Sequence, residues 1–317
     1  MSWGAPIWIY LWMAGMAGGG YLAAFVAERF SGESNGRLLR LATYLGIPLA
    51  IIGVILLIVD LGTPIWFWHL FTQFKVESPM SMGTWILLIW VILAVVMVML
   101  WWIKLRVGEG LAKMIGQLTS LIGWVNVIFA ILLITYTGVL LAVSSQSLWA
   151  GTVMLPTLFV ASAVSTGVAI VVLAAIAVNS IHNRGVVELQ LVLDWLFGTK
   201  EWTIPNKWVT RLAEADAIVI VMELAALIGY VIWMAVSTMA GAGEALKQLT
   251  VGNAALAVPF WLGVVLLALL IPLFLDIRNR GKAIETRTGW LTIVTSSTCV
   301  VLGGLVLRAI MTIGGQL

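Results

Sequence analysis

The 317-residue sequence is poor in the side chains that hold metals and redox groups, since it contains one cysteine and two histidines. Cys299 can form no disulfide within the chain and cannot by itself ligate an iron–sulfur cluster, which typically needs four thiolates. No CxxCH haem-attachment motif, Walker loop or GxGxxG pattern is present. A b-type haem usually needs two histidines at similar depth, and the spans predicted below place His69 and His182 at opposite membrane faces. We therefore expect a protein with no metal site, haem or iron–sulfur cluster of its own.

Charge is also scarce. Charged residues make up 10% of the chain and hydrophobic residues 62%, with a mean hydropathy of +1.09, whereas about 25% of an ordinary soluble domain is charged. This composition excludes a soluble globular protein, a disordered chain and a nucleic-acid-binding protein. The net charge of +3 indicates no polyanionic partner. The N-terminus lacks a basic segment, so we interpret it as a retained first span and not as a cleaved signal peptide.

Long runs without charge predict the membrane spans, each of which needs about 20 residues. The uncharged or nearly uncharged runs are 1–27, 41–59, 78–103, 114–183, 213–238, 248–275 and 288–307. The run 114–183 is too long for one helix, and Ser144-Ser145-Gln146-Ser147 predicts a turn that divides it. The sequence therefore predicts an all-α integral membrane protein with eight transmembrane helices.

The basic residues predict the orientation. Of the 17 lysines and arginines, three, three, four and four lie in the loops after spans one, three, five and seven. Only Lys75 and Lys247 fall on the opposite face, and Arg308 lies inside span eight. Because cytoplasmic loops are enriched in basic residues, we expect both termini outside the cytoplasmic (inner) membrane.

Spans one and five share a weak pattern of aromatic, proline and small residues. Span one has Trp3, Pro6, Tyr10, Gly15 and Gly18, and span five has Trp149, Pro156, Phe159, Ala163 and Gly167. This pattern suggests a parallel duplication, with a first four-helix membrane bundle at 1–143 and a second at 144–317. The small-xxx-small pair Gly15 and Gly19 predicts close helix packing.

Several segments resemble those of a known family. The most specific are Asp60-Leu61-Gly62-Thr63-Pro64, Trp66-Phe67-Trp68-His69 and Ser78-Pro79-Met80-Ser81-Met82-Gly83. Weaker matches are Tyr136-Thr137-Gly138-Val139-Leu140-Leu141, Leu155-Pro156-x-Leu158-Phe159, Ser165-Thr166-Gly167, Glu223, Gly303-Gly304-Leu305-Val306-Leu307-Arg308 and Gly314-Gly315-Gln316. Over essentially the whole chain, the sequence resembles the NrfD/PsrC family of quinone-reacting membrane subunits. These serve polysulfide reductase, cytochrome c nitrite reductase systems and related molybdenum or tungsten oxidoreductases.

The resemblance implies two haem-free four-helix bundles and a quinone pocket near the outer face. Menaquinone or ubiquinone would be the bound substrate. It also implies an extracytoplasmic partner, a four-cluster ferredoxin-like iron–sulfur subunit, usually joined to a molybdopterin or multihaem catalytic subunit of anaerobic respiration. The protein would then act in electron transfer only within the complex. A secondary transporter of duplicated-bundle type and a passive membrane anchor remain open alternatives.

With this resemblance, four side chains are candidate catalytic residues at the outer face, namely Asp60, His69, Tyr136 and Arg308. Each also has a simpler interpretation. Asp60 could end its helix in water, and His69 and Tyr136 could be interfacial residues. Arg308 could snorkel to the headgroups, form a buried pair with Asp60, or act electrostatically on a quinone.

Two further groups have alternative interpretations. Trp66, Phe67 and Trp68 would either form an aromatic belt at the headgroups or dock the iron–sulfur subunit. Asp216, Glu223 and Tyr230 are seven residues apart, nearly two helical turns, so they share one stripe of span six. Glu223 would sit near mid-membrane and belong either to a proton path from the cytoplasm or to a hydrogen bond that serves packing.

Overall fold

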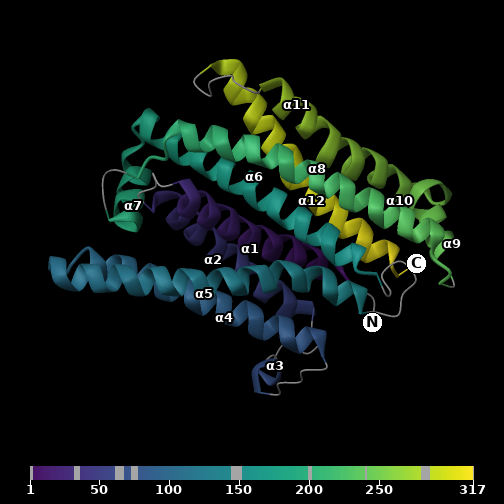
Figure 1. Ribbon diagram of the computed structural model, residues 1–317, viewed down its shortest axis with the longest axis horizontal. Coiled ribbons are helices and arrows are strands. Elements are labelled where there is room, and N and C mark those ends of the chain that lie inside the picture. Colours follow the sequence, from purple (N-terminus) through teal and green to yellow (C-terminus); the bar gives the residue numbers. More distant parts are fainter. Residues whose placement is uncertain are drawn as a thin grey trace.

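The computed structural model describes residues 3–31, 36–60, 68–72, 78–143, 152–198, 202–239, 241–279 and 286–316, and within these ranges every element is helical (Figure 1). The elements are α1 (Ala5–Ser31), α2 (Arg37–Asp60), α3 (His69–Thr72), α4 (Pro79–Lys104), α5 (Glu109–Ala142), α6 (Met154–Arg184), α7 (Val187–Phe197), α8 (Asn206–Val236), α9 (Ala242–Lys247), η2 (Gln248–Gly252), α10 (Ala254–Val258), η3 (Pro259–Leu270), α11 (Ile271–Asn279) and α12 (Arg287–Gly314).

Eight helical runs in the described residues are long and apolar enough to cross a membrane, which confirms the prediction. They are α1, α2, α4, α5, α6, α8, the continuous run Ala254–Asn279 and α12. Both ends of the chain lie at one end of the bundle, together with α3 and α9, while α7 lies at the other (Figure 1). We refer to the end with the termini as the outer end, following the predicted orientation.

Two span boundaries differ from the prediction. Span seven begins at Ala254 and not at 248, because Asn253 is extended (φ −123°, ψ 109°) and its side chain accepts a hydrogen bond from the Ala255 amide. Span four begins at Glu109, after the N-cap residue Gly108, so the predicted loop residue Lys113 lies on a helix. The predicted turn at 144–147 lies outside the described residues.

The sequence reasoning did not predict α7, a short helix at the inner end. Its Val187, Leu191 and Trp195 are exposed and four residues apart, so they form one apolar stripe. The Tyr44 hydroxyl donates a 2.6 Å hydrogen bond to the Leu196 carbonyl and ties α7 to α2. This arrangement is typical of a helix that lies in the membrane interface.

Helices α1 and α6 form the centre of the molecule. Helix α1 packs on α2, α5, α6 and α12, and α6 packs on α1, α5, α8 and α12. At their crossing, a Cβ on Gly19 would overlap the Ala163 carbonyl, and a Cβ on Gly167 would overlap the backbone of Gly19 and Gly20. The close packing predicted for the small-residue pair is therefore confirmed at Gly19. The predicted division into two four-helix bundles stays a prediction.

We expect Gly19→Ala to destabilise the purified protein by about 3 kcal/mol, at the upper end of typical overpacking costs, because the clash is with backbone. The matched control is Gly110→Ala on α5, where an added Cβ would meet no atom within 4 Å. Thermal melting in detergent should show a lower midpoint for Gly19→Ala only. Equal midpoints for the two variants would contradict a close α1–α6 contact.

Candidate functional site

An apolar groove of about 220 Å³ lies between α2 and α4 in the outer half of the bundle. Its walls are the aliphatic side chains of α2 residues between 51 and 58 and of α4 residues between 84 and 91. Among the described residues, Thr84 is the only polar one that lines it, and its hydroxyl donates to the Met80 carbonyl at 2.9 Å. The groove therefore suits an apolar ligand that enters from the lipid.

Two buried tyrosines lie directly behind this groove. The Tyr136 ring packs on Gly83, which precedes the groove residue Thr84, and a Cβ on Gly83 would overlap that ring. The Tyr10 ring packs on Gly53, where a Cβ would lie 3.1 Å from Tyr10 Cδ2. The two tyrosine side chains interact with each other. The Tyr10 hydroxyl nevertheless has no well-formed hydrogen bond within the described residues, so the pair holds an unused polar capacity beside the groove.

The segment Ser78-Pro79-Met80-Ser81-Met82-Gly83 has a structural explanation. Ser78 is the N-cap of α4 and accepts a hydrogen bond from the Ser81 amide at 3.5 Å, and Pro79 occupies the first turn. Gly83 then leaves the space that the Tyr136 ring fills. The motif thus starts a helix and seats a tyrosine next to the groove.

Asp60 is the last residue of α2 and is half-buried. A Cβ on Gly4 would lie 3.5 Å from Asp60 Oδ1, so the carboxylate sits beside the start of α1. A carboxylate is favourable near a helix N-terminus. Tyr10 lies about 9 Å further along α1, at 1.5 Å per residue. Asp60 therefore marks the outer end of the region that holds the two tyrosines.

Arg308 is completely buried and does not snorkel, which corrects that interpretation. Its Nε donates to the Leu11 carbonyl at 3.3 Å, and its Nη1 donates to the Gly304 carbonyl at 2.9 Å and to Ser162 Oγ at 3.2 Å. A Cβ on Gly15 would lie 2.7 Å from Nη2, so this glycine leaves room for the guanidinium. Helices α1, α6 and α12 together enclose the cation.

The acidic neighbour of this arginine is Glu223 on α8, and Asp60 is not among the partners of Arg308 in the described residues. Glu223 is buried, hydrogen-bonds Ser162 and feels the charge of Arg308. Ser162 thus links the carboxyl group to the guanidinium. The sequence reasoning missed Ser162; the available signal was its position, three residues before Ser165 on the same span.

The three residues of the α8 stripe, Asp216, Glu223 and Tyr230, are all buried. Toward the inner end, Ser165 Oγ donates to Asp216 Oδ1 at 2.9 Å. Asp276 on α11 is close enough to act electrostatically on Asp216, although the sequence reasoning did not single it out. Buried serines on α6 therefore accompany both acids of the stripe.

The outer aromatic segment is described only in part. Trp66 and Phe67 lie outside the described residues. Trp68 is 45% exposed, and its ring stacks on His69 with 3.6 Å between ring centroids. Both precede or begin α3, which packs on α4 at the outer end (Figure 1). His182 lies at the inner end of α6, so the predicted separation of the histidines is confirmed.

The fold and the site define a multi-pass membrane protein with an apolar groove backed by tyrosines and a buried arginine–carboxyl network. Residues 1–197 match the family model described as "Polysulphide reductase, NrfD". The chain therefore belongs to the NrfD family, which confirms the resemblance seen in the sequence.

Curated relatives agree over the full length. The sequence is 26% identical to "Protein NrfD" of Escherichia coli strain K12, with 100% of this protein and 96% of the relative aligned. It is also 26% identical to a membrane relative from Wolinella succinogenes that is named as one of the chains of polysulfide reductase, with 99% and 94% aligned. A "Protein NrfD homolog" of Haemophilus influenzae is similar to the same extent.

We expect Arg308→Met to lower the stability of the purified protein by about 3 kcal/mol, because it leaves the buried Glu223 carboxyl without its cation. Adding Glu223→Gln should recover part of this loss, since a neutral amide needs no counter-charge. Thermal melting of the two single variants and the double variant gives the coupling. Strictly additive losses would show that the two side chains do not stabilise each other.

Proposed function

We propose that this protein is the quinone-reacting membrane subunit of a respiratory oxidoreductase. It exchanges electrons between membrane quinone or quinol and an extracytoplasmic iron–sulfur subunit, and it is not catalytic alone. The observation that carries the proposal is the apolar groove between α2 and α4, backed by Tyr10 and Tyr136. Membership of a family described as polysulphide reductase, and a relative named as part of polysulfide reductase, support the oxidoreductase class.

The groove suits the isoprenoid tail of menaquinone or ubiquinone, which is apolar and arrives through the lipid. A head group that follows the tail past Thr84 would meet the Tyr136 hydroxyl, which can donate a hydrogen bond to a quinone carbonyl. Donors aimed at a developing charge commonly make the largest contribution to catalysis. Tyr136 is therefore the residue that we assign to substrate binding, with Tyr10 beside it.

Electrons and protons must balance at this site. Oxidation of a quinol releases two electrons and two protons, and the electrons pass to the nearest cluster of the partner subunit. Asp60, at the outer end of α2, is placed to pass protons to the outer side. His69 can carry a proton near neutral pH. We assign both to proton exchange at the outer surface.

The partner would dock on the outer end, where the segment with Trp66, Phe67 and Trp68 presents exposed aromatic area at Trp68. In the proposed complex, the protein lies in the inner membrane with both termini outside. Its partners are a four-cluster ferredoxin-like subunit and a molybdopterin or multihaem catalytic subunit. A secondary transporter should instead purify alone, and a passive anchor should tolerate changes at the groove.

We expect Tyr136→Phe to slow quinol oxidation or quinone reduction by the purified complex roughly 100-fold, because it removes one hydrogen-bond donor to the reacting oxygen. The matched control is Tyr44→Phe at the inner end, whose hydroxyl bonds the Leu196 carbonyl far from the groove. Stopped-flow reduction of the partner's clusters by a menaquinol analogue measures the rate. Normal rates in Tyr136→Phe, in an intact complex, would refute the assigned site.

We also propose that Asp216, Glu223 and Tyr230 belong to a proton path from the cytoplasm. The hydroxyls of Ser162 and Ser165 support it, because they hydrogen-bond the two carboxyl groups. About 10 Å separates successive residues of the stripe along α8. Water would have to bridge these steps.

We expect Glu223→Gln to abolish proton uptake coupled to turnover in sealed proteoliposomes, because the amide keeps the shape of the side chain but cannot exchange a proton. Glu188→Gln, an exposed acid on α7, is the control. A pH-sensitive dye inside the vesicles reports the uptake. Coupled uptake at the wild-type stoichiometry in Glu223→Gln would show that Glu223 is structural.

A further inference from the structure

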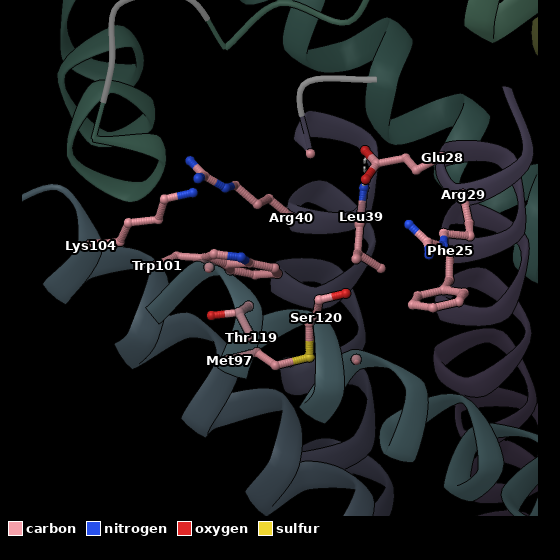
Figure 2. A pocket seen from close by; sticks show the side chains of 13 residues that line it. Phe25, Glu28, Arg29, Leu39, Arg40, Met97, Trp101, Lys104, Thr119 and Ser120 are labelled. Carbon is pink, nitrogen blue, oxygen red and sulfur yellow. Dashed lines mark hydrogen bonds between the residues drawn. The ribbon is translucent and has the colours of Figure 1, made fainter. Parts of the chain in front are cut away.

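A second and larger cavity, of about 340 Å³, opens at the inner end between α1, α2, α4 and α5 (Figure 2). Its volume falls within the range of ordinary ligand sites, about 300–1,000 Å³. The apolar groove and the arginine–carboxyl network share no lining residue with it in the described part of the chain. The cavity is therefore a separate site.

Positive charge dominates the cavity. Arg29, Arg40 and Lys104 line it together with one acid, Glu28. Figure 2 shows Arg40 and Lys104 on one side of the cavity and Arg29 on the other. The Glu28 carboxylate accepts a hydrogen bond from the Leu39 amide at 2.9 Å, which holds it against the backbone of α2. The balance favours an anionic ligand.

The cations are positioned by aromatic rings and leave donors available. The Arg40 guanidinium carbon lies 5.5 Å from the centre of the Trp101 ring, and that of Arg29 lies 5.9 Å from the centre of the Trp124 ring. Arg40 Nη1 donates to the Phe197 carbonyl at 3.2 Å, but its buried Nε has no hydrogen-bond partner among the described residues. Arginine donors of this kind suit phosphate oxygens.

The floor of the cavity is polar and narrow, whereas its flank is apolar. Thr119, Ser120 and Gly123 of α5 line the cavity. From its edge toward the membrane centre, α5 exposes an aliphatic stripe at helical spacing, made up of Leu121, Val125, Ile128 and Leu132. A ligand with an anionic head in the cavity could lay hydrocarbon chains along this stripe.

We propose that this cavity binds the phosphate headgroup of an anionic membrane phospholipid, with the acyl chains along the exposed stripe of α5. Basic pockets between transmembrane helices on the cytoplasmic side are suited to such headgroups. The positive-inside orientation puts this end of the bundle at the cytoplasmic leaflet. Free phosphate shares the headgroup chemistry but has nothing to place on the apolar stripe.

The test is a titration of the purified full-length protein by native mass spectrometry, with dioleoyl phosphatidylglycerol, dioleoyl phosphatidylcholine and inorganic phosphate as separate probes. The anionic lipid should bind at least tenfold more tightly than the zwitterionic one. The double variant Arg29→Gln/Lys104→Gln should bind it roughly 30-fold more weakly, since each basic residue near a membrane surface contributes about a factor of five. Unchanged melting of that variant without added lipid shows that it is folded.

The matched control is Lys113→Gln, which removes the same charge from an exposed position on α5 that does not line the cavity. It should bind the anionic lipid like the wild type. Equal weakening in the control would attribute the effect to surface charge and overturn the site. Equal affinity for the two lipids, or inorganic phosphate binding as tightly as phosphatidylglycerol, would overturn the lipid assignment. If the double variant fails to fold, Lys104→Gln alone should still show roughly fivefold weaker binding, and unchanged binding would refute the proposal.

Discussion

The crossing of α1 and α6 is the constraint on which the rest of the structure depends. Gly19, Gly20 and Gly167 let the two backbones touch, and neither helix could move apart without opening the centre of the molecule. In a membrane, where lipid is as apolar as the helices, such close packing is a main source of association. One turn before the crossing, Gly15 leaves the space into which α12 inserts the Arg308 guanidinium. The same small-residue pattern therefore joins the helices and creates a compartment for a buried cation.

Helix α1 also connects the two polar regions. Tyr10 belongs to the tyrosine pair behind the groove, and the carbonyl of the next residue, Leu11, accepts a hydrogen bond from Arg308. Phe159 on α6 lies against Arg308, with 5.6 Å between the guanidinium carbon and the ring centre, and also against Gly138, two residues from Tyr136. A change in the charge of the Arg308–Glu223 network would therefore be felt at the tyrosines through packed, buried groups, where electrostatic effects are stronger than in water.

The sequence was sufficient for the spans because charge and hydropathy report directly on the cost of placing a residue in lipid. It was less informative at Asn253, where one capping residue begins α10 and ends the preceding helical segment. The partner of Arg308 could not be predicted either, because depth alone left Asp60 and Glu223 both possible. Only the tertiary placement of Ser162 between α8 and α12 selects Glu223. Similarly, the role of Gly83 depends on which helix carries a large side chain opposite it.

The two cavities of the first half follow from one contact between α2 and α4. Near the middle of α2, Gly46 lies against the buried Trp90 ring, where a Cβ would sit 2.8 Å from Trp90 Cη2. Outward from this contact, α2 and α4 line the apolar groove with residues between 51 and 91. Inward from it, they line the basic cavity with Leu39, Arg40, Met97, Trp101 and Lys104. The Trp90 ring also packs edge-on against Tyr21, with 6.0 Å between centroids, so it is held from a third helix. A single aromatic side chain thus separates an apolar site in the outer half from a cationic site at the inner end, and each keeps the chemistry of its own membrane face.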